Sequence, residues 1–98
     1  MSQEEIFERV ETFLNEKMKS IRLDEDARSQ IDLYLENREY EMAFEGFFLE
    51  LMNSKENIEL DAQACTAMAV GLRLDRETVF DPDFWAKFQE FMGKSIRP

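Results

Sequence analysis

The chain has no histidine among its 98 residues. Histidine is the commonest acid–base catalyst and the commonest metal ligand, so its absence removes much of enzyme chemistry. Cysteine occurs once, at Cys65, which excludes an internal disulfide and suits a reducing cytoplasm. No apolar run approaches the ~20 residues of a membrane span, and the acidic start lacks the pattern of a secretory signal. We expect a soluble cytoplasmic protein that is not an enzyme and needs no cofactor.

Glycine and proline are also scarce, with three and two residues, and helical periodicity runs through nearly the whole chain. The pattern predicts a single all-α domain over residues 1–98, a small bundle of about five helices. Ser2, Asp24, Asp61 and the pair Asp81–Pro82 have the residue types that start helices. The expected interruptions are a turn with left-handed Asn37, a loop over 53–60, a connector at 76–80 and a stop at Gly93.

Negative charge is abundant but unevenly placed. Of the net charge of −10, the segment 24–61 contributes −9, from twelve carboxylates and three bases, whereas 1–23 contributes −1 and 62–98 contributes nothing. A charge confined to one segment produces an oriented field that favours a strongly basic partner. Because no segment offers a basic stripe, direct binding to nucleic acid or to a membrane surface is not expected.

The acidic central helix pair, residues 24–53, is the expected contact surface. With the apolar stripes turned inward, the first of these helices shows carboxylates and one leucine to solvent, and the second shows glutamates with Met42 and Leu49. A solvated surface alone could show such residues, but like charges at (i, i+4) beside exposed apolar side chains are typical of an interface. The predicted partner-binding residues are Glu25, Asp32, Leu33, Glu36, Tyr40, Glu41, Met42, Glu45 and Leu49.

No catalytic, cofactor-binding or metal-ligating residues are predicted. With twenty-two acids in the chain, carboxylate pairs arise by chance. Residues 24–36 superficially resemble a calcium loop but lack its central glycine and ligand spacing. Cys65 falls on the apolar stripe of its helix, which predicts a buried, inert thiol.

The segment 31–45, IDLYLENREYEMAFE, resembles the core motif of the MafI-type immunity proteins. In that motif a helix ends in Tyr-Leu or a similar pair. A short polar turn follows, and then the sequence Glu-Tyr-Gly-Leu-Ala-Leu-Glu. Glu39, Tyr40, Ala43 and Glu45 match it directly, and Glu41 stands where glycine is usual. GLRLD at 71–75 is similar to the way the next helix ends in that family.

The resemblance implies a small helical cytoplasmic antidote encoded beside a polymorphic toxin, as in contact-dependent growth-inhibition systems. Many such toxins are ribonucleases, including EndoU-type enzymes. The chain would then be a monomer that forms a 1:1 complex with a basic nuclease toxin domain and covers its substrate cleft or active site. The residues themselves leave an alternative open, an acidic helical adaptor or regulatory subunit of another basic protein.

Overall fold

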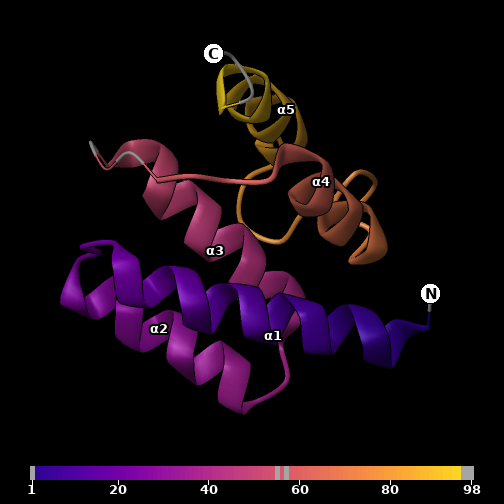
Figure 1. The fold of residues 1–98 in the computed structure, drawn as a ribbon. Helices are drawn as coiled ribbons and strands as arrows, with labels where there is room; N and C mark the ends of the chain where they lie inside the picture. The colour runs from indigo at the N-terminus through magenta and orange to yellow at the C-terminus, as the bar shows by residue number, and fades with distance from the viewer. Residues whose placement is uncertain (1, 55, 57, 96–98) are drawn as a thin grey trace.

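A computed structural model describes residues 2–54, 56 and 58–95, and over these residues the protein is a bundle of five α-helices without a strand (Figure 1). The helices are α1 (Gln3–Ser20), α2 (Glu25–Glu36), α3 (Tyr40–Asn53), α4 (Ala62–Gly71) and α5 (Phe84–Ser95). The predicted all-α fold is confirmed. None of the described helices combines the length and the apolar character that crossing a membrane requires.

Three of the predicted helix starts are capped as expected. The side chains of Ser2, Asp24 and Asp61 each accept a hydrogen bond from the backbone N–H three residues later, at 3.2, 3.4 and 3.0 Å. Each bond satisfies one of the donors that a helix leaves free at its start. These caps depend only on local sequence, which is why the pattern locates them.

The last helix departs from prediction at both ends. Asp81 accepts a bond from the N–H of Asp83 at 2.8 Å and pairs with Lys87, so Asp81–Pro82 form a turn before α5 begins at Phe84. The prediction that Gly93 ends the helix is wrong, because α5 continues to Ser95. A single exposed glycine costs a helix only about 1 kcal/mol and does not by itself terminate it.

The turn between α2 and α3 uses a different residue from the one predicted. Asn37 has φ −90°, and the left-handed residue is Arg38, with φ 59°. The N–H of Glu39 reaches the carbonyl of Tyr34 at 2.8 Å, and the N–H of Arg38 reaches Leu35 at 3.1 Å, the paired bonds of a Schellman motif. α2 thus extends one residue further before the chain reverses.

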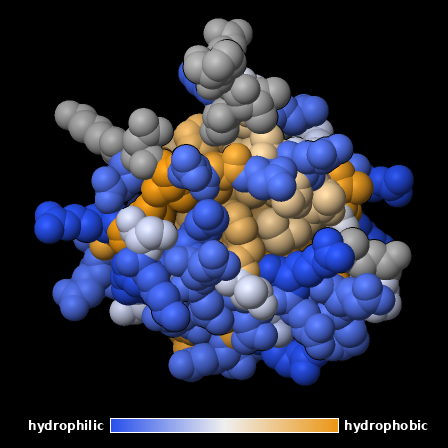
Figure 2. Space-filling view, viewed as in Figure 1, coloured by the Kyte–Doolittle hydropathy of each residue, from blue (hydrophilic) through white to orange (hydrophobic). Residues whose placement is uncertain are grey.

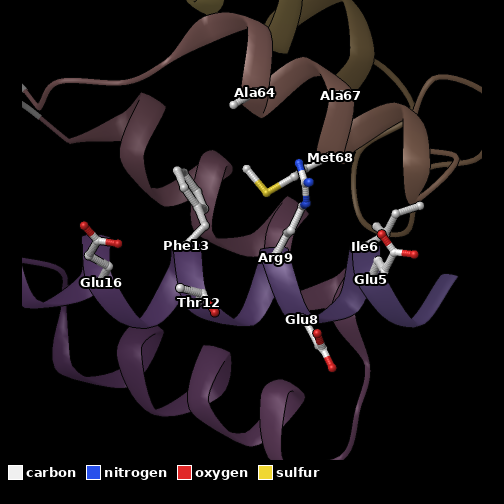
Figure 3. A pocket seen from close by; sticks show the side chains of 10 residues that line it. All are labelled: Glu5, Ile6, Glu8, Arg9, Thr12, Phe13, Glu16, Ala64, Ala67 and Met68. Atoms are coloured by element: carbon white, nitrogen blue, oxygen red, sulfur yellow. The ribbon is translucent and has the colours of Figure 1, made fainter. Parts of the chain in front are cut away.

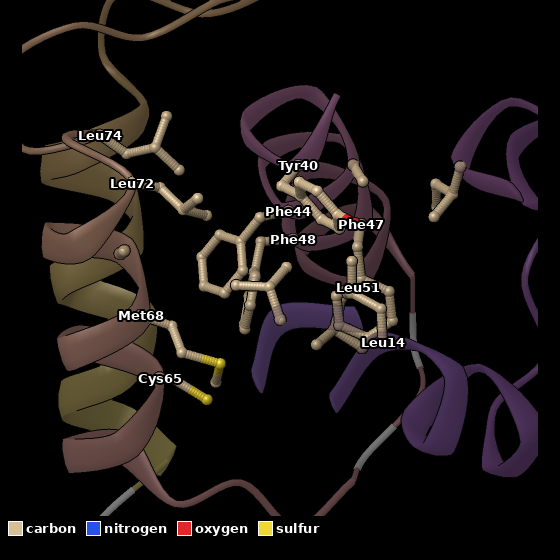
Figure 4. Packing of buried hydrophobic residues seen from close by; sticks show 14 of the residues in the cluster. Leu14, Tyr40, Phe44, Phe47, Phe48, Leu51, Cys65, Met68, Leu72 and Leu74 are labelled. Carbon is tan, nitrogen blue, oxygen red and sulfur yellow. The ribbon is translucent and has the colours of Figure 1, made fainter. Parts of the chain in front are cut away.

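The core is built around α3. This helix packs against α1, α2 and α5, and its phenylalanines 44, 47 and 48 are completely buried. Figure 4 shows their rings between the leucines of α1 and α3 on one side and Cys65, Met68, Leu72 and Leu74 on the other. Aromatic and aliphatic groups from every helix therefore meet on α3, which leaves that helix without a wide solvent-facing side.

α1 and α4 approach closely where Ile6 meets Gly71. A Cβ atom placed on Gly71 would lie 2.7 Å from Cδ1 of Ile6 and 3.1 Å from both of its γ carbons. The whole branched side chain of Ile6 therefore occupies the space that the missing side chain leaves. Gly93, by contrast, has no atom within 4 Å of such a Cβ.

We predict that Gly71→Ala lowers the free energy of unfolding by about 1–2 kcal/mol, because overpacking outweighs the gain in helix propensity. Gly93→Ala, the matched control, should raise it by about 0.5–1 kcal/mol, since only the propensity changes. Urea denaturation of both variants measures the difference. In an Ile6→Ala background the Gly71→Ala penalty should disappear; a penalty of unchanged size there would show that Ile6 is not its cause.

Candidate protein-interaction surface

The outward side of α2 lies where the sequence predicts it. Glu25, Ser29, Asp32, Leu33 and Glu36 are all exposed, and we call this set the α2 face. Leu33 keeps 49% of its surface accessible, although the inner side of the helix buries Ile31 and Leu35. Because α2 packs chiefly on α3, it is a peripheral helix whose outer side is free over its full length.

Within the part of the chain that the structure describes, no carboxylate of the α2 face forms an ion pair. The ion pairs within the described residues join Arg38 to Glu4, Lys87 to Asp81 and Lys94 to Glu90. The single base of α2, Arg28, donates instead to the carbonyl oxygen of Ile21 at 3.0 Å. The negative charge of the α2 face is therefore available to a partner.

The second half of the predicted surface, on α3, is not formed as expected. Tyr40, a predicted contact residue, is 5% exposed and its ring stacks on Phe7 of α1 with centroids 4.4 Å apart, so it belongs to the core. Glu45 is wholly buried, so the prediction that it faces solvent is wrong. Glu41, Met42 and Leu49 are half-buried. The reason is the central place of α3, which is covered by other elements on several sides.

Glu45 is the one buried charged side chain among the described residues, and its partners are backbone groups. One carboxylate oxygen accepts from the N–H of Val79 at 2.7 Å, and the other accepts from Phe80 and Asp81 at 2.8 and 2.9 Å. Successive N–H groups of this kind form a concave site for an anion. Three charge-assisted bonds offset the desolvation of the carboxylate without a cation. Glu45 therefore has a structural role that joins α3 to the segment before α5.

This attachment holds two apolar side chains at the surface. Val79 and Phe80 are 46% and 45% exposed, while their backbone N–H groups are bound by Glu45. The ring of Phe80 lies beside Tyr34 of α2, with centroids 5.9 Å apart. Together with Ala27, Leu49 and Glu50 these rings line a shallow hollow of about 230 Å³. An exposed aromatic group thus adjoins α2.

Sequence reasoning missed Phe80 because it lies in a connector without periodicity. The apolar pair Val79–Phe80 before Asp81–Pro82 was the available signal, but such a pair is equally compatible with burial. The backbone N–H of Phe80 donates to Glu45, more than thirty residues away in sequence, so no local pattern locates this segment.

The described residues contain no group of three or more Cys, Asp or Glu side chains arranged to hold a metal ion. Cys65 is buried as predicted, and burial raises the pKa of its thiol to about 12, with a further contribution from Asp61. A thiol that stays protonated is a poor nucleophile.

Comparisons of the chain with protein-family models, with curated proteins and with solved structures find no match. The likeness of 31–45 to the MafI-type motif therefore stays a prediction from sequence. The structure places three of its matching residues, Tyr40, Ala43 and Glu45, in the interior. Packing explains the first two, and the hydrogen bonds from residues 79–81 explain Glu45.

We predict that Glu45→Gln lowers the free energy of unfolding by about 2–3 kcal/mol, because an amide oxygen cannot accept all three bonds and its NH₂ group would face a donor. Glu50→Gln on the same helix removes the same charge from a half-buried side chain that accepts none of these bonds, and should change stability by less than about 0.5 kcal/mol. Urea denaturation compares the two. Equal losses would show that charge, not the bonds to 79–81, explains the effect.

Cys65 gives a prediction for alkaline pH. Its pKa is about 12 in the folded protein against an ordinary 9.0, so the folded state binds the proton more tightly. The resulting stability is complete below about pH 9 and is lost as pH rises toward 12, at up to about 1.4 kcal/mol per pH unit. Cys65→Ala should show a shallower decline of unfolding free energy above pH 9. Parallel declines in the two proteins would contradict this.

Proposed function

We propose that the protein is an immunity protein that binds the basic domain of a nuclease toxin and covers its substrate cleft. The observation that carries the proposal is the α2 face, where carboxylates without intramolecular cations surround Leu33 and lie on the helix that Phe80 adjoins. The resemblance of 31–45 to MafI-type proteins supplies the class of partner. The charge and the exposed apolar groups supply the mode of contact.

A nuclease must attract a polyanion, so its cleft is lined by lysine and arginine. Carboxylates on a rigid helix can enter such a cleft, exclude the nucleic acid and accept charge-assisted hydrogen bonds from those bases. The α2 backbone is held by Ile31 and Leu35 in the core, so binding orders the outer side chains but costs little backbone entropy. The face therefore acts as a preorganised substitute for phosphates.

The free protein tolerates repulsion that a cationic partner would relieve. Asp32 and Glu36 are like charges at (i, i+4), which destabilises a helix by about 0.2–0.5 kcal/mol. A base bound between them converts that repulsion into attraction. The long-range field also accelerates encounter, toward ~10⁸–10⁹ M⁻¹s⁻¹ at low salt. An antidote benefits from speed because it must act before the toxin cuts its target.

Exposed apolar groups provide anchoring contacts, which charge alone does not. Leu33 lies within the α2 face, and Phe80 lies against Tyr34 on the same helix. Interfaces concentrate affinity in a few such anchors, with charged groups around them selecting the partner. We therefore assign anchoring to Leu33 and Phe80 and steering to Glu25, Asp32 and Glu36.

The test is the triple variant Glu25→Lys, Asp32→Lys and Glu36→Lys, assayed against the nuclease toxin domain encoded beside this gene. We expect the association rate to fall roughly tenfold or more at low salt, because steering is reversed. The matched control reverses Glu77, Asp83 and Glu90, three exposed acids outside α2, with the same change in net charge. Stopped-flow association at two salt concentrations measures both, and circular dichroism verifies folding.

Equal slowing in the two triple variants would show that net charge acts without a specific face. An association rate of the wild-type complex that does not change with salt concentration would exclude the steering mechanism. Should the neighbouring gene encode no nuclease while a basic non-nuclease protein binds the α2 face, the chain is an adaptor and the immunity function is wrong.

A further inference from the structure

α4 differs from the other described helices because it contains no charged residue. Its outer side is nevertheless exposed at Gln63, Ala64, Ala67 and Val70, the last with 46% of its surface accessible. A helix that is apolar around its circumference is ordinarily buried. Figure 2 shows the result, a continuous pale orange area over α4 bordered by the hydrophilic side chains of α1.

Hollows lie on both sides of this helix. The one between α1 and α4 has a volume of about 610 Å³ and an apolar floor made by Ile6, Phe13, Met68 and the two alanines 64 and 67 (Figure 3). The other, of about 870 Å³, lies between α4 and α5 and shares Ile6 and Ala67 with the first. The close contact of Ile6 with Gly71 fixes the distance between α1 and α4.

The rim of the first hollow is acidic. Glu5, Glu8 and Glu16 of α1 line it and are exposed, against the single base Arg9. From Glu5 to Glu16 the rim follows α1 for three turns, about 17 Å at 1.5 Å per residue. In Figure 3 Arg9 extends from α1 across the hollow toward Met68, with Glu16 on one side of it along α1 and Glu5 and Glu8 on the other.

An apolar floor beside a line of carboxylates fits one kind of occupant. We propose that the hollow between α1 and α4 is a second docking site, which binds a cationic amphipathic helix of three to four turns. Its apolar side would cover Ala64, Ala67 and Met68, and its Lys or Arg residues would reach Glu5, Glu8 and Glu16. A second copy of this chain is a poor occupant, because each copy has a net charge of −10.

The site is independent of the proposed function. α4 lies on the opposite side of α1 from α2 in Figure 1, and it carries none of the residues of the α2 face. A variant can therefore disable either surface alone.

The experiment titrates the ¹⁵N-labelled full chain with a synthetic helical peptide of about 14 residues, with Leu at i, i+3, i+4 and i+7 positions and Lys between them. We expect amide shifts to concentrate in α4 and along the glutamate side of α1. Ala67→Lys should weaken binding at least tenfold by filling the hollow with a like charge. Ala86→Lys, the control, places the same side chain at an exposed alanine of α5 that lines neither hollow and should leave affinity unchanged.

Three results would overturn the proposal: shifts confined to α2, equal weakening by Ala86→Lys, or equal binding of a peptide with the same residues in scrambled order. The triple α2 variant of the preceding section should still bind the peptide at α4, and Ala67→Lys should still bind the toxin domain. If only the α2 variant loses toxin binding, the toxin domain uses the α2 face. If only Ala67→Lys loses peptide binding, the peptide uses the hollow beside α4.

Discussion

Three consecutive backbone N–H groups donate to the Glu45 carboxylate, and the arrangement of the second half of the molecule depends on these bonds. A buried carboxylate without a cation would cost several kcal/mol if its oxygens were unsatisfied. Here both oxygens are used, and the segment 79–81 cannot move without breaking all three bonds. The connector between α4 and α5 is thereby attached to the central helix. Its position brings Phe80 against Tyr34 and sets where the turn into α5 begins.

The same constraint explains why one helix, not two, carries the acidic surface. α3 has to contact α1, α2, α5 and the 79–81 segment, so its glutamates are either buried or partly covered. α2 contacts the rest of the bundle mainly through α3 and keeps a full side for solvent. A peripheral helix can bear uncompensated charge because water screens it, whereas a fully buried position of the central helix can bear a carboxylate only when its hydrogen bonds are complete.

Sequence reasoning succeeded where structure is decided locally. The helices and the caps at Ser2, Asp24 and Asp61 follow from neighbouring residues, and the burial of Cys65 follows from its place on an apolar stripe. It failed for the outer side of α3, because YEMAFEGFFLELMN has apolar residues on almost every side and more of its circumference is buried than one inward stripe. The helical pattern predicts Glu45 on the outside, and the donors that satisfy it in the interior lie more than thirty residues away. No periodic pattern in the sequence indicates such a contact. Arg38 was missed because glycine or asparagine is the usual left-handed residue at a helix end.

The two surfaces would respond differently to salt, and this distinction follows from their composition. As a binding surface, the proposed α2 face would act mainly through exposed charge, which a Debye length of about 8 Å at physiological ionic strength largely screens beyond the first contacts. The proposed site beside α4 would act mainly through apolar area, which salt does not weaken. A partner that engages α2 would therefore associate quickly and with a steep salt dependence. A partner seated on α4 would show a shallower dependence that reflects only the three glutamates of the rim. Because the bundle holds the two surfaces on opposite sides of α1, one molecule can present both without competition between their occupants.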